Sequence, residues 1–563
     1  MLYLQYMTLQ RRRHKVGGKA MKQTLYFNGD IITVNDAKPM AEAVLVEDGN
    51  IKAVGTYDEM KQLSNEATFM YDLKGHTMLP GFIDGHSHIT FADICPRFDA
   101  PPVGNVDCVD KLVESAKSFL EKNPIEGNNW MMGMGYDNSA FPGHRHPTMA
   151  DMDRISTDVP VVMMHASGHV AVCNSKLFEV LGITKDTPNP EGGVYQKDAI
   201  TGELTGLVEE TALTKEIFDN MPLPDFKFLT EGVLRSQELY LKNGITTAQD
   251  GSCDPQSMQL WQHLSMQGKL HIDICAYVKI DSPACEFMLG KESIHEKYMN
   301  GVKFAGMKLF LDGSPQAKTA WLTKPYYIVP ESEKENYCGY PVYPDDDKVC
   351  EFVKMCLRNK WQLITHCNGD AAIDQLINQY TRAQKETGIY DDLRPVVIHC
   401  QTVREDQLDR MKEIGMMPSF FHDHVMFWGD WHLDSVFGPE RGSRISPLAT
   451  TVKRKMPFTL HQDTPVAPPN MMLTIHNAVN RKTASGRPIG PEFAISPLEA
   501  LKGVTIHGAY EYFEENKKGS IEVGKVADFV IIESNLLEVP KEAIKDIRVL
   551  NTIKNDEVVY SAN

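Results

Sequence analysis

The sequence lacks several features that would place it in a simple class. Its eleven cysteines form no Cys-x-x-Cys pair and no regular framework, which is typical of a reduced cytosolic protein. No apolar run approaches about 18 residues, so no membrane-spanning helix is predicted. Positive charge is not in excess, because 58 Lys and Arg face 75 Asp and Glu. The net charge of −17 argues against a nucleic-acid partner.

The first residues do not look like a folded segment. The basic patch at Arg11 to Lys15 is not followed by an apolar stretch long enough for a secretory signal. Structure-like patterning begins near Met21. We therefore expect residues 1–20 to be a flexible extension, or the product of an upstream start, of a cytoplasmic protein.

Both ends of the remaining chain are rich in predicted strands. Residues 22–79 look all-β, with strand-length runs broken by Asn-Gly, Asp-Gly and Lys-Gly. Residues 519–533 and 547–561 have the same character. We predict that residues 21–79 and 508–563 form one β-sandwich, which brings the two ends of the chain together.

The middle of the chain, residues 80–507, predicts an α/β fold, a (β/α)8 TIM barrel. Eight β-rich segments alternate with helical patterns, as such a barrel requires. They lie at 79–88, 244–250, 270–278, 304–313, 361–367, 394–400, 415–423 and 457–463. The interval at about 95–240 is too long for one crossover, so we predict an inserted subdomain over the barrel mouth.

Side chains able to bind a metal stand at the ends of these segments. His86 and His88 follow an apolar run two residues apart, so along a strand they point the same way. Four more candidates end later segments: Lys308, His366, His399 and Asp463. Each has an ordinary alternative, such as a rim histidine, a surface-reaching lysine or an N-cap aspartate. Six such groups at the strand ends, where barrel active sites lie, are hard to assemble by accident.

The residue types indicate hydrolytic metal chemistry. Neutral imidazole and carboxylate suit zinc and similar divalent ions. A divalent ion lowers the pKa of bound water from about 16 to about 7, and two ions about 3.5–4 Å apart can share the resulting hydroxide. Asp463 would hold the proton lost on attack and deliver it to the leaving nitrogen. A buried Lys308 can lose its proton and react with carbon dioxide, giving an anionic carbamate that can bridge two cations.

Weaker candidates accompany this set. His165 and His169 in HASGH reach into the mouth from the insert, or hydrogen bond locally in a loop. Asp312 in FLDGS orients substrate or caps a turn, and the turn is slightly favoured. His422 and His424 end the seventh segment. At least one is expected to face the site, with His422 as a candidate substrate contact, and rim hydrogen bonding is favoured over metal ligation.

These motifs together resemble a known family. LPGFIDGHSH, KLFLDGS, HCNGDAAID, VVIHC, HQDTPVAPP and GSIEVGKVADFVI look like the amidohydrolase superfamily. HASGHVAVCNSKLFEVLGI, PEGGVYQKDAITGELTGLVEE and TASGRPIGPEFAISPLEALKGVTIHGAYEYF are similar to the insert and tail of its amidohydrolase-3 branch, the YtcJ-like and N-substituted formamide deformylase group. The resemblance runs from about residue 22 to 560.

The resemblance carries specific expectations. It implies a (β/α)8 barrel with a composite β-sandwich, and a hydrolase of amide or related C–N bonds that uses divalent metal ions, two zinc ions being the leading choice. The positions that match the family's metal ligands are His86, His88, Lys308, His366, His399 and Asp463. Lys308 matches the bridging N6-carboxylysine, and His169 is raised as a substrate contact. The HQD at 461–463 departs from the GSD of many relatives and leaves the shape of the pocket open there.

Three functions stay open at this point. The first is hydrolysis of N-formyl or N-acyl amines, with a largely apolar small-molecule substrate suggested by Trp130, Phe141 and several methionines. The second is a mononuclear ring deaminase, although the Glu that such enzymes often carry three residues after the fifth-strand histidine is absent after His366. The third is a binding or regulatory protein on the same barrel. No membrane partner is expected, and a homodimer is a reasonable prior.

Overall fold

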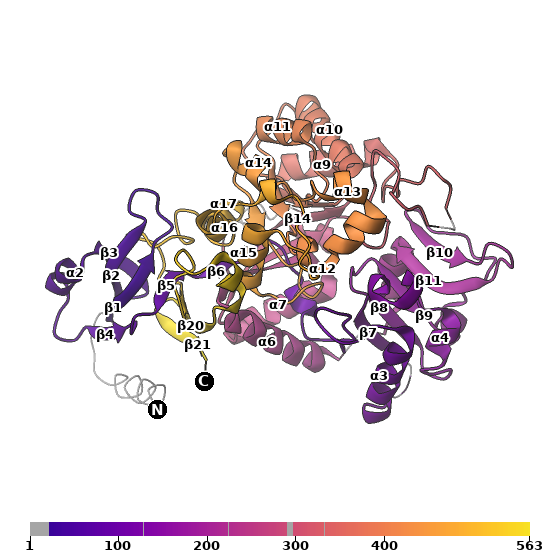
Figure 1. Ribbon diagram of the computed structural model, residues 1–563, viewed down its shortest axis with the longest axis horizontal. Helices are drawn as coiled ribbons and strands as arrows, with labels where there is room; N and C mark the ends of the chain where they lie inside the picture. The colour runs from indigo at the N-terminus through magenta and orange to yellow at the C-terminus, as the bar shows by residue number, and fades with distance from the viewer. Residues whose placement is uncertain are drawn as a thin grey trace.

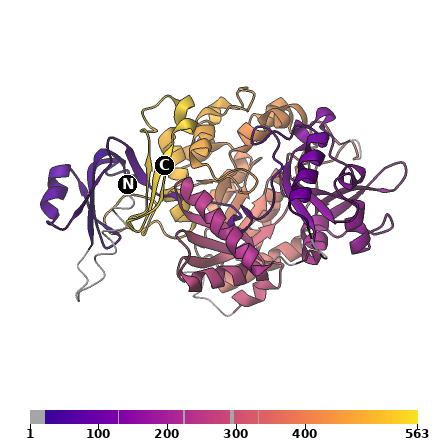
Figure 2. The same cartoon turned by 90° about the horizontal axis from the view of Figure 1, so that it is seen from below.

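The protein is described here by a computed structural model that covers residues 22–125, 127, 129–222, 225–289, 297–330 and 333–562. The extension expected at residues 1–20 lies outside the described residues. Figure 1 shows a β-rich lobe at the left, a central α/β body and a further lobe at the right. Figure 2 shows the same three parts from below, with strands from both chain ends together in the left-hand lobe.

Eight strands form the sheet of the central body, and their order in the sheet follows their order in the chain. Every paired neighbour runs parallel. The strands are β6 (Phe82–Ile83), β12 (Ile245–Cys253), β13 (Asp273–Lys279), β14 (Val302–Phe310), β15 (Gln362–Cys367), β16 (Val396–His399), β17 (Met417–Phe420) and β18 (Thr459–Leu460). Each overlaps one of the eight predicted segments, because short apolar runs bounded by turns are typical of strands that are buried on both faces.

Helices connect these strands. α10, for example, begins after Gly369 and ends at Gly388, whose φ of +69° suits a residue without Cβ. Its buried face includes Ile373, Leu376 and Ile377, which have the spacing of a helix packed on a sheet. The helices of this body are α6 (Phe226–Lys242), α7 (Pro255–Gln267), α8 (Ala284–Met288), α9 (Asp346–Asn359), α10 (Asp370–Thr387), α11 (Glu405–Glu413), α12 (His424–Trp431), α13 (Gly438–Gly442), α14 (Leu448–Lys453), α15 (Met471–Asn480), α16 (Pro497–Gly503) and α17 (Ile506–Glu511).

The first and last strands of the central sheet approach one another just beyond their ends. A Cβ added to Gly85 would lie only 2.6 Å from the side chain of Thr459 on β18. The backbone N–H of His88 donates to the carbonyl of Thr464 at 2.7 Å. The segment that follows β6 therefore lies directly beside the segment that follows β18.

The two chain ends share one sheet. β5 pairs antiparallel with β19, which joins the N-terminal strands to the C-terminal ones. The strands are β1 (Gln23–Ile32), β2 (Met40–Glu47), β3 (Asn50–Gly55), β4 (Phe69–Asp72), β5 (Thr77–Pro80), β19 (Phe529–Ile532), β20 (Val549–Lys554) and β21 (Glu557–Ser561). One face of this sheet has its own core, with Val44, Met78, Phe529 and Ile553 fully buried.

One helix corrects the prediction that residues 22–79 are all β. α2 (Tyr57–Leu63) lies between β3 and β4. Its N-terminus has a capping box, in which Thr56 and Glu59 hydrogen bond to each other's backbone. That pairing satisfies N–H groups that a helix start leaves without partners, and so stabilises a helix of only seven residues.

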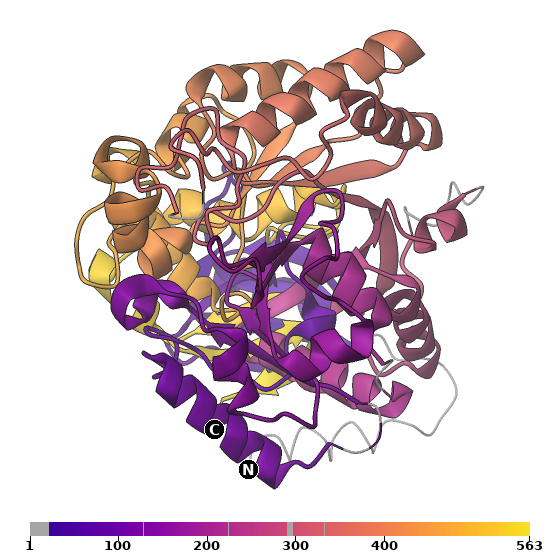
Figure 3. The same cartoon turned by 90° about the vertical axis from the view of Figure 1, so that its right-hand side faces the viewer.

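The segment predicted as an insert holds a separate five-stranded sheet in the order β10-β11-β9-β8-β7. Its strands are β7 (Met131–Tyr136), β8 (Val161–His165), β9 (Val170–Cys173), β10 (Gly193–Lys197) and β11 (Leu204–Glu210), with helices α3 (Val109–Lys122), α4 (Met149–Asp153) and α5 (Ser175–Leu181). Figure 3, seen from the right of Figure 1, shows this insert lying in front of the central body.

No helix within the described ranges combines the length and the apolar character needed to cross a membrane.

A buried network of charges joins the outer sheet to the central one. Asp273 on β13 accepts from Lys518 and from Lys554 of β20, the latter at 2.7 Å. Lys518 also pairs with Glu514 at 3.1 Å, and Lys554 pairs with Asp528 at 2.6 Å. Burial opposes the ionisation of Asp273, but the charges of the two lysines outweigh it and lower its pKa. Asp273 therefore links side chains that lie more than 240 positions away in the chain.

Replacement of Asp273 tests this network. Asp273→Ala leaves two buried ammonium groups short of a partner, so we expect a loss of about 2–4 kcal/mol in the free energy of unfolding. Because the carboxyl pKa is lowered by folding, this contribution is present above the ordinary aspartate pKa and is lost as the pH falls below about 4. Denaturant unfolding at several pH values measures both effects.

The matched control for this prediction is Asp107→Ala, which breaks the exposed pair with Lys111. It should change stability by less than about 0.5 kcal/mol. Equal effects of the two variants would show that the buried network adds nothing beyond an ordinary surface pair.

Candidate active site

The six predicted strand-end residues meet at one edge of the central sheet. Parallel strands place their carboxyl ends on the same edge. The register of the strands also aligns their ends: Phe310 of β14 is opposite His366 of β15, and Cys367 of β15 is opposite His399 of β16. His86 and His88 follow β6, and Asp463 follows β18. The contact between these two segments brings the HxH pair beside Asp463.

The interatomic distances show a compact cluster. The Nε2 atoms of His86 and His88 lie 3.5 and 3.3 Å from Oδ1 of Asp463, and one ligand atom from each of the three residues lies within 4.8 Å of the other two. Lys308 Nζ is 3.1 Å from His86 Nε2, and His399 Nε2 is 3.9 Å from Asp463 Oδ2.

The fourth histidine of the set, His366, lies beside His399, with the two ring centroids 4.6 Å apart. The structure thus brings all six predicted residues together. Five of them are at most 7% exposed, and His88 retains 19% exposure of its side chain.

Two of the six residues have strained backbones. His399 and Asp463 have φ angles of +70° and +54°, in the left-handed region that residues with a Cβ rarely occupy. Strain of this kind costs on the order of 1–3 kcal/mol and concentrates at functional sites, where it aims a side chain. Here both residues turn out of the strand direction and into the cluster.

His86 is oriented by Gln249, a residue of β12 that sequence reasoning missed. The amide nitrogen of Gln249 donates to the carbonyl of Gly85 at 2.9 Å, so its oxygen is the acceptor for His86 Nδ1. His86 therefore carries its proton on Nδ1, and the lone pair of Nε2 points at Lys308 and Asp463. The sequence contained one indication of a role for Gln249: the polar Gln-Asp pair ends an apolar strand run.

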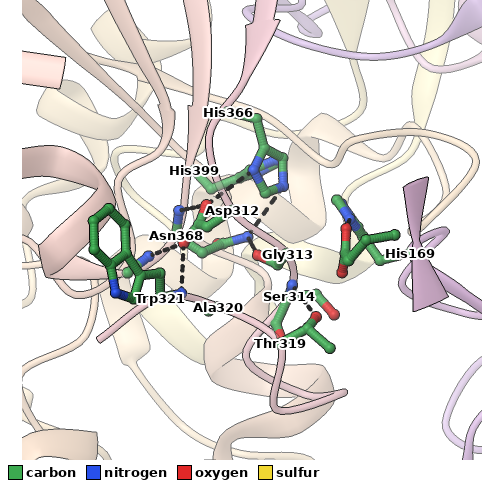
Figure 4. Close-up of polar contacts among 12 residues, drawn as sticks. His169, Asp312, Gly313, Ser314, Thr319, Ala320, Trp321, His366, Asn368 and His399 are labelled. Atoms are coloured by element: carbon green, nitrogen blue, oxygen red, sulfur yellow. Dashed lines mark hydrogen bonds and ion pairs between the residues drawn. The ribbon is translucent and has the colours of Figure 1, made fainter. Parts of the chain in front are cut away.

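His366 is oriented by Asp312, as Figure 4 shows. Asp312 Oδ1 lies 3.1 Å from His366 Nδ1. The same carboxylate accepts the backbone N–H groups of Asn368, Gly369 and Trp321 at 2.7–3.0 Å. Burial raises the pKa of Asp312 to about 7, against the effect of these donors. Asp312 fixes both the loop and the ring, and Nε2 of His366 lies 3.3 Å from the side-chain nitrogen of Asn368.

His399 is backed by His461, the histidine of the HQD departure. His461 Nε2 is 3.2 Å from His399 Nδ1, and its Nδ1 is 2.8 Å from Ser419 Oγ. Burial lowers the pKa of His461 to about 3, so the ring is neutral and can accept the Nδ1 proton of His399. Sequence reasoning placed the departure in the pocket without assigning this role.

Burial sets the charge of the cluster. It lowers the pKa values of His86, His366 and His399 far below the ordinary range, so these rings are neutral at pH 7. The contacts of His86 and His399 with Asp463 are therefore not ion pairs. Burial also lowers the pKa of Lys308 to about 7. Within the described residues Lys308 has no ion pair; its Nζ contacts His86 and lies 4.7 Å from the centroid of the Phe310 ring.

These groups fit a divalent metal. Neutral imidazole nitrogens with exposed lone pairs and a carboxylate are the ligand types of zinc-like ions. Oδ1 of Asp463 is buried and has no hydrogen-bond donor among the described residues, although two imidazole nitrogens face it. One of them, Nε2 of His86, carries a lone pair, and two acceptors that face one another repel unless a cation lies between them. The donor set therefore suits a cation at the point where they converge.

The remaining candidates lie around the cluster. His169 of the insert faces His366, with ring centroids 4.6 Å apart (Figure 4), and Glu210 accepts from its Nδ1 at 2.7 Å. Burial opposes protonation of His169, but Glu210 outweighs it and raises the pKa. His422 Nε2 is bonded to the Asn477 carbonyl at 3.1 Å, so its contact with substrate stays a prediction.

Two further histidines lie beside an apolar wall next to the cluster. His424 packs edge-on against Phe421, with centroids 4.4 Å apart, and His165 lies 3.5 Å from Asp137. The wall joins insert and central body and consists of Met134, Ala166, Phe421, Trp428, Val466 and Ala467. Asp137 accepts the indole N–H of Trp428, which fixes the position of that ring.

Comparisons with known proteins identify the family of this chain. The sequence profile of the Amidohydrolase family matches residues 70–560. YtcJ of Bacillus subtilis (strain 168) is 25% identical over 555 residues, covering 96% of this chain and 99% of its own length. N-substituted formamide deformylase of Arthrobacter pascens is 24% identical over 560 residues, covering 96% of this chain and 98% of its own.

A solved structure, that of an uncharacterized metal-dependent hydrolase from Pyrococcus horikoshii OT3, shares the fold. Its TM-score is 0.71 at 23% identity, covering 92% of this chain and 99% of that one. Because the family profile matches most of its length, the chain belongs to the amidohydrolase family, a family of hydrolases. Within it the chain falls in the YtcJ-like branch, as its motifs predicted.

Proposed function

We propose that this protein is a metal-dependent hydrolase of amide-type C–N bonds, acting on N-formyl or other N-acyl amines. One observation carries the proposal: three neutral imidazoles held by separate partners, His88, a buried lysine without an acidic partner and Asp463 converge at one point. A network of this kind is costly to bury, and its donor atoms are the ones that hydrolytic metal sites use. The name of the Arthrobacter relative supports the substrate class.

Two divalent ions, with zinc as the first choice, would be held by this set. His86, His88 and Asp463 form one ligand group, and His366 and His399 form the other. When bound, such ions lower the pKa of water and polarise a carbonyl. We infer that Lys308 supplies the bridge: its neutral amine attacks carbon dioxide, the N–C bond forms, and one proton is lost to solvent, which leaves a carbamate.

The chain's own residues would then have two roles in the reaction, proton transfer and the orientation of the imidazoles. Asp463 takes the proton of the attacking water on its carboxylate and returns it to the nitrogen of the scissile bond, so that an amine leaves. Its strained backbone holds the carboxylate in place for both transfers. The partners Gln249, Asp312 and His461 fix the three imidazoles, so that no reorganisation is needed during the reaction.

The apolar wall favours an apolar substituent on the substrate. Met134, Phe421 and Trp428 are each at most 4% exposed and lie beside the cluster. Val466 of the same wall is three residues from Asp463, so a substrate carbonyl at Asp463 would place its substituent against these side chains. We infer a benzyl or similar group on the nitrogen or acyl side.

The proposed architecture extends the observed one. We infer that the central sheet closes as a (β/α)8 barrel, which the contact of Gly85 with Thr459 supports. We also infer that the outer sheet acts as a composite β-sandwich domain.

Metal removal tests the function. Purified protein, stripped with a chelator and reloaded with Zn²⁺, is assayed on N-formyl and N-acetyl amines that carry methyl or benzyl groups. We expect about two ions per chain by elemental analysis, loss of turnover on stripping, recovery on reloading, and a preference for benzyl. Absence of turnover across the panel with metal bound would refute the proposal. One ion per chain with ammonia release from ring substrates would establish the deaminase instead.

A further inference from the structure

His169 and Glu210 form a pair on the insert, across from the strand ends of the central sheet. Glu210 is the last residue of β11, and His169 directly precedes β9. These strands are antiparallel neighbours, and the N–H of Glu210 donates to the carbonyl of His169 at 2.9 Å. The backbone of the insert therefore holds the two residues side by side.

Their side chains meet through one strong hydrogen bond. Oε2 of Glu210 lies 2.7 Å from Nδ1 of His169, and the two side chains are only 4% and 14% exposed. Because the carboxylate takes Nδ1, the opposite edge of the ring, Nε2, is turned away from Glu210. Figure 4 places His169 opposite His366, and the two ring centroids are 4.6 Å apart.

This arrangement by itself adds little to the stability of the fold. Glu210 has a φ of +50°, a strained conformation for a residue with a Cβ. Its Oε1 is buried and has no hydrogen-bond partner among the described residues. The Glu210 carboxylate fits beside residue 313 only because that residue is glycine. A Cβ on Gly313 would lie 2.0 Å from Glu210 Oε1. A strained, buried and half-satisfied carboxylate is destabilising unless it serves a site.

We propose that Glu210 is a positioning residue for the reaction. By accepting the Nδ1 proton of His169, it holds the Nε2 edge of that ring over the cluster, where the edge contacts the acyl group of the substrate. This inference rests on the proposed function. The insert then takes part in the site. His169, just before β9, contacts the substrate, and Glu210, at the end of β11, sets the orientation of the His169 ring.

A double-mutant cycle tests the inference. We expect Glu210→Ala and His169→Asn each to lower kcat/KM by about 10- to 100-fold, and the double variant to be no slower than His169→Asn alone, because Glu210 acts only through that ring. Glu210→Gln keeps an oxygen that can accept from Nδ1 and should fall between Glu210→Ala and the wild type. The matched control is Glu209→Gln, which alters the neighbouring acid on β11 that bonds Tyr340 instead; its activity should be unchanged.

Two further readouts separate orientation from stability. Metal content should be the same in Glu210→Ala and the wild type, and thermal unfolding should occur at the same or a higher temperature, because the strained and half-satisfied carboxylate is gone. A crystal structure of Glu210→Ala should show the His169 ring displaced. Additive losses in the cycle, or an undisplaced ring, would overturn the inference. A wild-type enzyme that turns over no amide would overturn the proposed function, and the crystal structure would still decide whether Glu210 holds the ring.

Discussion

Asp463→Asn should lower kcat by about 10²- to 10⁴-fold while the protein stays folded. The amide cannot accept the proton of the attacking water, and so it has none to return to the leaving nitrogen. Its oxygen can still face His86 and His88, which lie 3.5 and 3.3 Å from the carboxylate oxygen in the native site. We therefore expect most of the metal to stay bound. Steady-state kinetics on an N-formyl amine and elemental analysis measure the two quantities.

The control for Asp463→Asn is Asp434→Asn, which removes an exposed carboxylate that pairs with Arg487. It should leave kcat unchanged. Retention of wild-type turnover by Asp463→Asn would remove this residue from the mechanism. A complete loss of metal in the same variant would show that Asp463 acts as a ligand first, so that its part in proton transfer is not separable.

Lys308→Ala should lose at least one metal ion per chain and lower kcat/KM by more than about 10²-fold. Lys308 Nζ lies 3.1 Å from His86 Nε2, and alanine leaves no group there that could carry a bridge. Burial lowers the lysine pKa to about 7, so in neutral solution a large fraction of the amine has the free lone pair that carbon dioxide requires. Metal content and activity are measured with and without added bicarbonate.

Two variants make this prediction specific. Lys308→Glu places a carboxylate near the bridge position and should retain more metal than Lys308→Ala. Lys318→Met removes another partly buried lysine, which bonds Ser435 instead, and should keep the full metal content. If Lys308→Ala bound two ions and remained active, the bridging role would be wrong.

The sequence was most informative where chemistry and strand position coincide. His86 and His88 are recognisable because a two-residue spacing puts them on one side of a strand. Lys308, His366 and His399 stand out as polar groups that interrupt or end apolar runs. The α2 helix was missed although its capping box, Thr56 with Glu59, was readable, because a seven-residue helix between strands shows too little periodicity.

The partners of the site were hidden for a different reason. Gln249 lies 163 positions from His86, and Glu210 lies 41 positions from His169. No local pattern connects such pairs, since hydrogen bonds between distant segments depend on how strands are paired and how an insert is docked. His461 was visible as a departure from the family pattern, yet its contact with His399 required the eighth strand to pair with the seventh, which in turn pairs with the sixth.

The amino-acid order alone determined the strand and helix rhythm and the six converging residues, because these follow from periodicity and spacing within short windows. The family followed from motifs that resemble those of known proteins. Only the tertiary structure decided which nitrogen of His86 and of His399 carries the proton, that Lys308 is buried with no ion pair among the described residues, and that the insert places His169 beside His366. Those properties depend on burial and on contacts between remote segments, and both arise only when the whole chain has packed.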